Sequence, residues 1–380
     1  MELPLDYATL KVLWWGLVGV LLIGYALTDG YDLGVAALLP FVARTDSERR
    51  LVINSIGPTW EGHQVWLITG GGALFAAWPY VYAISFSGFY LAMFVVLAAL
   101  ILRPVGFKYR SKRPSAAWRN GWDWALFVGG FVPALIFGVA LGNVLQGVPF
   151  NIDQTLRASY SGGLLGLLNP FALLAGLASV AMLLLHGASY LVVKIERGPV
   201  MDRAIKFGLR AGLAVMIFYA LAGLWLWKSG MGYAITSPID PDGAANPLRK
   251  EVAAAAGAWL QNYGRYPWMI AAPALGFAGT LIAIVGLRLK SPIAIVGSGL
   301  GAGGIVASVG ASMFPFILPS SLNPNASLTV WDSSSSHMTL FIMLVVTAVL
   351  LPIVLLYTAW VFKVLWGRLS VEDANAPGSY

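Results

Sequence analysis

Residues 51–78 of the chain read LVINSIGPTWEGHQVWLITGGGALFAAW, a mostly apolar stretch with one glutamate, Glu61, inside it. A membrane-spanning helix needs about 20 predominantly apolar residues, so this stretch is long enough to cross a bilayer. A charged side chain at membrane depth is costly, and it usually has a partner and a task. The stretch therefore predicts a membrane protein in which Glu61 carries part of the function.

The composition of the whole chain agrees with a membrane protein. Of its 380 residues, 58% are hydrophobic and 11% are charged, whereas soluble domains carry about 25% charged residues. The chain has no cysteine, which excludes disulfides, thiolate metal sites and iron–sulfur clusters held by its own side chains. The net charge of +7 comes without a long basic run, so we expect no nucleic acid partner.

Apolar segments divide the chain into nine expected transmembrane helices. The first has no basic region before it and no small-residue cleavage site after it, which indicates a retained helix and not a signal peptide. The glycine-rich eighth segment predicts close packing against its neighbours, because small residues let helices approach. The segments cover residues 10–28, 51–78, 81–102, 122–146, 169–193, 206–228, 267–287, 292–316 and 338–366.

The basic residues predict the orientation of these helices. The connections after segments 1, 3, 5 and 7, together with the C-terminal end, contain 17 Lys and Arg residues, against 5 in the other connections. Basic loops stay on the cytoplasmic side, so we expect an outer N-terminus and an inner C-terminus. The run from Arg103 to Arg119 is interpreted as a cytoplasmic loop lying against anionic headgroups.

The segments also suggest a domain division for an all-α polytopic membrane protein. Eight helices can form two four-helix bundles, with one peripheral helix beside them. The expected boundaries are 1–150 for the first bundle, 151–318 for the second, and 319–380 for an outer loop, the ninth helix and a cytoplasmic tail.

The depth of Glu61 depends on where the second helix begins. If that helix begins near Arg50, Glu61 lies about 15 Å along it, near the middle of the membrane, where a carboxylate suits transient protonation. If it begins at Pro58, Glu61 lies in the first turn and simply favours the helix dipole. A proton-transfer role for Glu61 is the interpretation that we favour.

Two further acids, Asp29 and Asp32, are three residues apart at the inner end of the first segment. On a continuous helix they share a face and could collect protons for a deeper site. The alternative is an ordinary helix end, because Thr28, Gly30 and Gly34 around them are typical of turns.

Histidines and tryptophans near Glu61 are weaker candidates. His63 is two residues from Glu61, so a helix places the two on nearly opposite faces. A haem held by His63 and His186 is possible only if these face each other, and a hydrogen-bonded packing role is the simpler reading of His186. Trp60 and Trp66 are expected mainly to pack, although they flank the acid.

Taken in order along the chain, several motifs resemble one known family. The chain is similar to subunit II of the cytochrome bd-type ubiquinol oxidases over nearly its whole length. The motifs are TDGYDLG at 28–34, NSIGPTWEGHQVWL at 54–67, RPVGF at 103–107, GNVLQGVPF at 142–150 and MFPFILPSS at 313–321.

The resemblance implies a complex in the bacterial inner membrane that oxidises ubiquinol and reduces O2 to water. Haem b and haem d are then carried by a partner, subunit I, and this chain is a haem-free subunit of two four-helix bundles and a ninth helix. The resemblance also implies a possible small single-helix accessory subunit and a ubiquinone bound against this chain.

The same resemblance implies roles for individual residues. Asp29 and Glu61 match acids on a proton path from the cytoplasm, and Trp66 matches a residue beside an oxygen route. Asp32, Trp60 and His63 are possible neighbours of either path. Relatives often have Asp at the position of Glu61 and Asn at that of His63, so the hydrogen bonds of His63 are left open.

A different class of function also fits the pattern. A multi-pass secondary transporter would use Glu61 as a coupling acid, and it would need no haem-bearing partner. A haem-carrying subunit and a purely structural subunit are the remaining alternatives.

Overall fold

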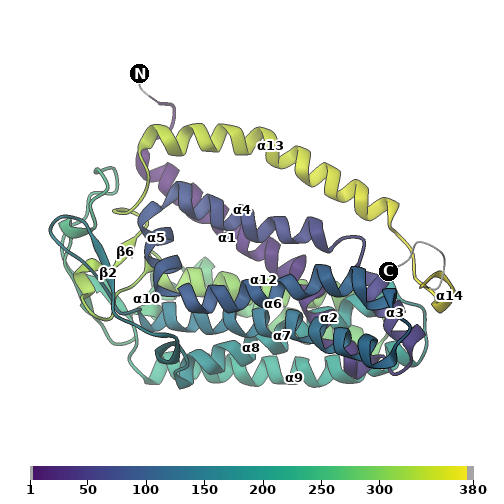
Figure 1. Ribbon diagram of the computed structural model, residues 1–380. Coiled ribbons are helices and arrows are strands. Elements are labelled where there is room, and N and C mark those ends of the chain that lie inside the picture. The colour runs from purple at the N-terminus through teal and green to yellow at the C-terminus, as the bar shows by residue number, and fades with distance from the viewer. Residues whose placement is uncertain (1–2, 375–380) are drawn as a thin grey trace.

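The computed structural model describes residues 3–374, and it shows long helices that run side by side, with short hairpins gathered at one end (Figure 1). The helices are α1 Tyr7–Leu27, α2 Asp29–Val42, α3 Asp46–Ile56, α4 Trp60–Ala77, α5 Pro79–Gly88, α6 Tyr90–Tyr109, α7 Ala116–Gln146, α8 Pro170–Lys194, α9 Pro199–Lys228, α10 Ala258–Arg265, α11 Ala271–Arg288, α12 Ile293–Met313, α13 His337–Val364 and α14 Val371–Ala374. The strands are β1 Phe150–Ile152, β2 Ala158–Tyr160, β3 Tyr233–Ile235, β4 Val252–Ala254, β5 Phe316–Leu318 and β6 Leu328–Thr329.

The predicted fold class, an all-α polytopic membrane protein, is confirmed. Within residues 3–374, eight helices are long and apolar enough to cross a membrane, counting α1 and α2 together. The helix α4, which contains most of the second predicted span, is not among the eight. The eight are Tyr7–Val42, Tyr90–Lys112, Ala116–Gln146, Pro170–Lys194, Pro199–Lys228, Pro267–Arg288, Ile293–Met313 and His337–Val364.

The second predicted span, 51–78, is not one helix. The chain forms the short helix α3, turns at Gly57-Pro58-Thr59, and begins α4 at Trp60. Proline lacks a backbone N–H and its ring clashes with the preceding turn, which explains the break. Thr45 begins α3 with a capping box to Glu48, so α3 is a separate helix with its own start signal.

The third predicted span, 81–102, is also shifted. The chain forms the short helix α5 and then the spanning helix α6, with a break at Phe89. Helix α6 continues seven residues past the predicted end and carries Pro104 inside it. The predicted span ends before Arg103, the first charged residue after it, because the sequence does not show that this charge has a buried partner.

Helix α2 lies at the centre of the packing and is buried along almost its whole length. It crosses α8 where Gly34 and Gly187 meet, and a Cβ on Gly34 would overlap the backbone of Leu183. Gly130 of α7 approaches α2 in the same way, at the carbonyl oxygen of Leu33. These glycines let three backbones come close enough to enclose the side chains of α2.

The predicted close packing of the glycine-rich segment is confirmed. Helix α12 packs along α11, and a Cβ on Gly279 or Gly304 would overlap the backbone of the opposite helix. Helix α13 has the opposite character, because Leu340 is the one residue of this fully described helix that is buried. It runs along the outside of the other helices, beside α1 and α4 in Figure 1.

The three hairpins form a cap at one end. Strand β1 pairs with β2, β3 with β4, and β5 with β6, all antiparallel. Lys11 of α1 is fully buried under this cap, and its Nζ donates to the carbonyl oxygens of Pro241, Gly243 and Trp331. Nearby, Lys250 Nζ lies 2.6 Å from Asp332 Oδ2 in a second buried contact.

The basic run from Arg103 to Arg119 is not simply a surface loop against headgroups. Arg110 is buried, with its Nε 2.5 Å from Asp123 Oδ1 and its Nη2 2.9 Å from Asp46 Oδ1. Arg49 reaches Asp123 at 2.6 Å, and Arg119 reaches Asp46 at 2.8 Å. These ion pairs bind α3 to the start of α7, so part of the basic run stabilises the fold.

Candidate functional site: a buried acid–base cluster

The cluster begins at the bend between α1 and α2. The Thr28 hydroxyl donates to the Gly24 carbonyl at 2.7 Å, and Asp29 begins α2. Both oxygens of Asp29 accept from Arg103 of α6, at 3.0 and 2.7 Å, and both side chains are fully buried. Such a bidentate pair fixes geometry as well as charge, and it joins α2 to α6 inside the protein.

Asp32 forms the second half of the cluster on the same face of α2. Its Oδ2 lies 2.6 Å from His63 Nδ1 and 3.9 Å from Arg103 Nη2. The other ring nitrogen of His63, Nε2, lies 3.3 Å from the Tyr31 hydroxyl. Tyr31 in turn stacks on Tyr190, with ring centroids 4.1 Å apart.

Asp29 and Asp32 differ in the contacts that their carboxylate oxygens make. Asp29 uses both oxygens on Arg103, whereas Asp32 uses one oxygen on His63. Within residues 3–374, the buried atoms Asp32 Oδ1 and Arg103 Nε have no hydrogen-bond partner. Buried polar atoms are normally satisfied by protein or ordered water. Asp32 therefore keeps one buried oxygen without a partner, whereas both oxygens of Asp29 accept from Arg103.

Glu61 does not join this cluster. Because α4 begins at Trp60, Glu61 lies in its first turn, and the interpretation that it lies ten residues into a longer helix is wrong. The side chain is exposed on the surface of the chain, and no ion pair or hydrogen bond of its carboxylate is found within residues 3–374. Helix α4 has 18 residues, so Glu61 lies at one end of this helix.

Trp60 and Trp66 pack on opposite sides of this region. Trp60 is buried, its ring lies 5.5 Å from that of Phe107, and the Arg103 guanidinium sits 5.9 Å from the Trp60 ring. Trp66 packs on α1, where a Cβ on Gly24 would lie 2.5 Å from its ring. Trp60 thus covers the buried cluster, and Trp66 holds α4 against α1.

His186 has both ring nitrogens in hydrogen-bond contact. Nδ1 lies 2.8 Å from the Ser298 hydroxyl, and Nε2 lies 3.0 Å from the Leu27 carbonyl oxygen. His63 and His186 flank the ring of Tyr31 from two directions. The packing role expected for His186 fits these contacts, since neither nitrogen points to a free space between the two histidines.

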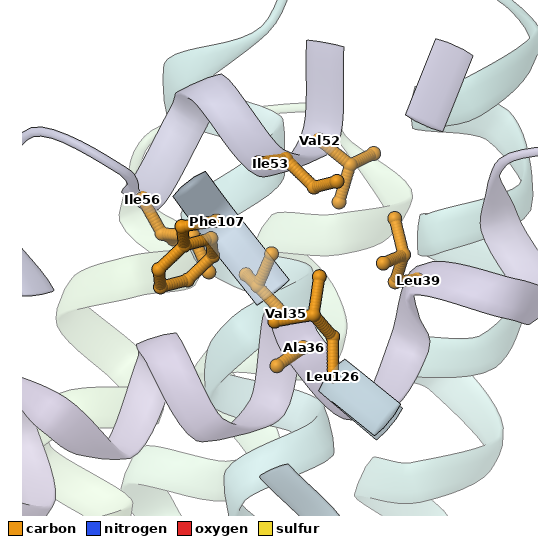
Figure 2. A pocket seen from close by; sticks show the side chains of 8 residues that line it. All are labelled: Val35, Ala36, Leu39, Val52, Ile53, Ile56, Phe107 and Leu126. Atoms are coloured by element: carbon orange, nitrogen blue, oxygen red, sulfur yellow. The ribbon is translucent and has the colours of Figure 1, made fainter. Parts of the chain in front are cut away.

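A small pocket lies close to the cluster but has a different chemistry. It is too narrow to hold a water molecule, and Figure 2 shows the aliphatic and aromatic side chains that line it. These residues come from α2, α3, α6 and α7, and none can bind a proton or an ion. The lining residues are Val35, Ala36, Leu39, Val52, Ile53, Ile56, Phe107 and Leu126.

Sequence reasoning missed the partners of the acids. Arg103 was assigned to a loop, Tyr31 was in a family motif but was not named as a candidate, and Tyr190 lies in none of the motifs. One signal was available, because two acids in or beside an apolar segment need a positive partner. Arg103 is the basic residue that follows the third apolar segment directly.

The comparisons with known proteins agree with one another. The family model "Cytochrome bd terminal oxidase subunit II" matches residues 10–365. The chain is 52% identical to cytochrome bd-I ubiquinol oxidase subunit 2 of Escherichia coli K12, over 97% of both chains. It is 48% identical to a probable cytochrome oxidase subunit 2 of Haemophilus influenzae, over 98% of this chain and 97% of the relative.

A solved structure supports the fold. The bd oxidase of Geobacillus thermodenitrificans contains a chain that superposes with a TM-score of 0.69, at 17% identity, over 94% of this chain and 98% of that one. At this identity the likeness concerns the fold alone. Together with the family match over residues 10–365, these findings show that the chain belongs to the cytochrome bd terminal oxidase subunit II family.

Proposed function

We propose that this chain stabilises the haem-bearing subunit I of a quinol oxidase and supplies part of its proton path. The complex would oxidise ubiquinol and reduce O2 to water in the bacterial inner membrane, with the N-terminus periplasmic and the C-terminus cytoplasmic. The E. coli relative is named cytochrome bd-I ubiquinol oxidase subunit 2, which supports ubiquinol as the substrate of the complex. Family membership favours this function over a secondary transporter.

Haem b and haem d are assigned to the partner. Of the three histidines, His63 and His186 have both ring nitrogens in hydrogen-bond contact, and His337 Nε2 contacts the Leu5 carbonyl oxygen at 2.7 Å. No group of three His, Asp or Glu side chains suited to a metal ion occurs in the described part of the chain. These residues do not fit haem ligation, which supports a haem-free role.

The face of α4 that carries Glu61 is the surface that we assign to subunit I. Val65, Ile68 and Phe75 on this helix are exposed, at 51%, 74% and 58%. An exposed carboxylate beside apolar side chains is costly in lipid, and it is acceptable against a polar partner. The small accessory subunit, the bound ubiquinone and the two-bundle division rest on the resemblance and belong to the same proposal.

The proton path would use both faces of α4. His63 points into the protein and contacts Asp32, whereas Glu61, two residues earlier, is exposed. An imidazole can take a proton on one nitrogen and release one from the other, and His63 has Asp32 at Nδ1 and the Tyr31 hydroxyl at Nε2. The resemblance implies that Asp29 and Glu61 both lie on the path. Because both oxygens of Asp29 accept from Arg103, Asp29 would also hold Arg103 in place, with Asp32 and His63 between Asp29 and Glu61.

The observation that carries this proposal is the contact between Asp32 and His63. The exposed Glu61 lies two residues before His63 on α4. The first test is a mild-detergent purification of the tagged chain from native membranes, followed by a reduced-minus-oxidised visible spectrum. A stoichiometric partner with b-type and d-type bands is expected. A preparation without haem and without a partner would contradict the proposal and return attention to transport.

A further inference from the structure

An aromatic cluster lies where α2, α7 and α9 come together. Phe41 of α2 has its ring 6.1 Å from Trp124, 5.7 Å from Phe127 and 5.8 Å from Phe207, measured between centroids. Phe41 and Trp124 are 43% and 46% exposed. Rings that are almost half exposed do not belong to the protein core, so these aromatic side chains form part of the surface.

Two cations of α9 adjoin this surface. The Arg210 guanidinium lies 5.7 Å from the ring centroid of Phe207, and Lys206 is one helical turn before it. Both side chains are exposed, and within residues 3–374 no carboxylate lies within 4.0 Å of either. The acid one turn before Lys206, Asp202, makes its ion pair with Lys290 at 2.7 Å and interacts with Lys206 only at longer range.

The position of these cations along the helix is informative. Helix α9 has 30 residues, about 45 Å, which exceeds a hydrocarbon core of about 30 Å. Lys206 and Arg210 therefore lie near the boundary at the end that the basic residues predict to be cytoplasmic. Further along the same helix, Leu213 and Ile217 are exposed at 60% and 47%, as lipid-facing residues are.

This surface is on the far side of the protein from the face assigned to subunit I. Figure 1 shows α9 and α4 on opposite sides of the helices, with α12 and α6 between them. This step rests on the proposed function: with α4 against subunit I, the α9 face is in contact with the bilayer. A second protein is thus not required to cover it.

We propose that Lys206, Arg210 and the aromatic cluster bind one anionic phospholipid of the inner leaflet. The two cations match the phosphate of the headgroup in charge, and Arg is suited to phosphate because it presents several N–H donors. Phe41, Phe127 and Phe207 offer an apolar surface for the acyl chains, and Leu213 and Ile217 are exposed apolar residues further along α9. The partner is a lipid with a net negative headgroup, such as phosphatidylglycerol or its dimeric form.

The test uses the complete oxidase complex, washed in detergent and then analysed for retained lipids by mass spectrometry. The variants are Arg210→Gln, Lys206→Gln with Arg210→Gln, and Phe41→Ala. Lys228→Gln is the matched control, because Lys228 is an exposed cation at the other end of the same helix. The visible spectrum of each preparation confirms assembly and is independent of the lipid measurement.

Each cation near an anionic membrane surface strengthens attachment by about fivefold. We expect wild type and Lys228→Gln to retain phosphatidylglycerol, Arg210→Gln to retain about fivefold less, and the double variant about 30-fold less. Phe41→Ala should lose lipid as well. Equal retention in all variants, or equal retention of zwitterionic phosphatidylethanolamine by wild type, would overturn the proposal even if the oxidase function holds.

Discussion

His63 Nδ1 lies 2.6 Å from Asp32 Oδ2, and both side chains are buried between α4 and α2. This contact joins the helix that carries Glu61 to the helix that carries Asp29. It places a side chain that can exchange protons at two atoms between a buried carboxylate and a tyrosine hydroxyl.

Glu61→Gln keeps the size and polarity of the side chain but removes its ability to carry a proton. We expect oxygen consumption per haem to fall by about 100-fold or more, as is usual for general acid–base groups, while haem content stays normal. Glu61→Asp keeps a carboxylate and should be mild. Glu196→Gln is the control, since Glu196 is exposed in the α8–α9 connection; full activity of Glu61→Gln would exclude the proton role.

His63→Asn keeps a polar group near Asp32 but removes the ring that has a nitrogen at each end. If His63 passes protons, turnover should fall several-fold and proton uptake should slow in step with it, with unchanged haem bands. The measurement is stopped-flow proton uptake by the assembled complex with a pH indicator dye. A structural role alone predicts lower yield and unchanged turnover per haem, so the two readouts separate the alternatives.

Removal of Asp29 leaves the Arg103 guanidinium buried without its bidentate partner. Breaking a buried pair costs about 3–5 kcal/mol, so Asp29→Asn should lower the amount of assembled complex. Asp29→Asn combined with Arg103→Gln removes both charges and should recover part of the yield. If the double variant is as poor as Asp29→Asn alone, the harm comes from a cause other than the unpaired cation.

The buried pair of Lys250 and Asp332 offers a test outside the membrane spans. Burial raises the pKa of the Asp332 carboxyl and lowers the pKa of the Lys250 ammonium, so for each group the folded protein disfavours the charged form. Lys250→Met alone should cost about 3–5 kcal/mol. Adding Asp332→Leu should recover part of this cost, because the remaining loss is the hydrogen bond from the Thr329 N–H to Asp332.

The pH dependence of this pair follows from the same directions. A carboxyl whose pKa is raised on folding adds stability below its unfolded pKa, and this contribution is lost as the pH rises through the folded value. An ammonium whose pKa is lowered adds stability above its unfolded pKa and loses it as the pH falls. Both contributions should be absent from the double variant, which thermal unfolding of the complex at several pH values would reveal.

The crossing of α2 and α8 should tolerate no side chain at Gly34. A methyl group there would overlap the Leu183 carbonyl oxygen, so Gly34→Ala should separate the helices and prevent accumulation of the complex. Gly16→Ala is the same change where no atom lies within 4 Å of the added Cβ. Equal yields of the two variants in a membrane immunoblot would contradict the packing seen at Gly34.

Hydropathy predicted most of the fold, because the length of an apolar run directly reflects the thickness of the bilayer. Helices α7, α8, α9, α11, α12 and α13 each lie where an apolar segment predicted a span. The errors occur at 51–78 and 81–102, where Pro58 and Phe89 interrupt the apolar pattern. A break of one or a few residues does not change an average taken over 20 residues.

The candidate site was only half visible. Asp29, Asp32 and Glu61 stand out because the sequence contains few charged residues. The sequence alone was therefore enough to mark these acids as unusual. The partners of Asp32 and Asp29 are His63 and Arg103, which lie 31 and 74 positions away along the chain.

The sequence by itself therefore determined a polytopic helical membrane protein, its family motifs and the acids that need explanation. The tertiary structure alone decided that Asp29 pairs with Arg103, that Asp32 pairs with His63, and that Glu61 is left exposed. The physical reason is that hydropathy is a local property of the chain. The pairing of a buried charge depends on which helices cross, and that is set by close contacts such as the one at Gly34.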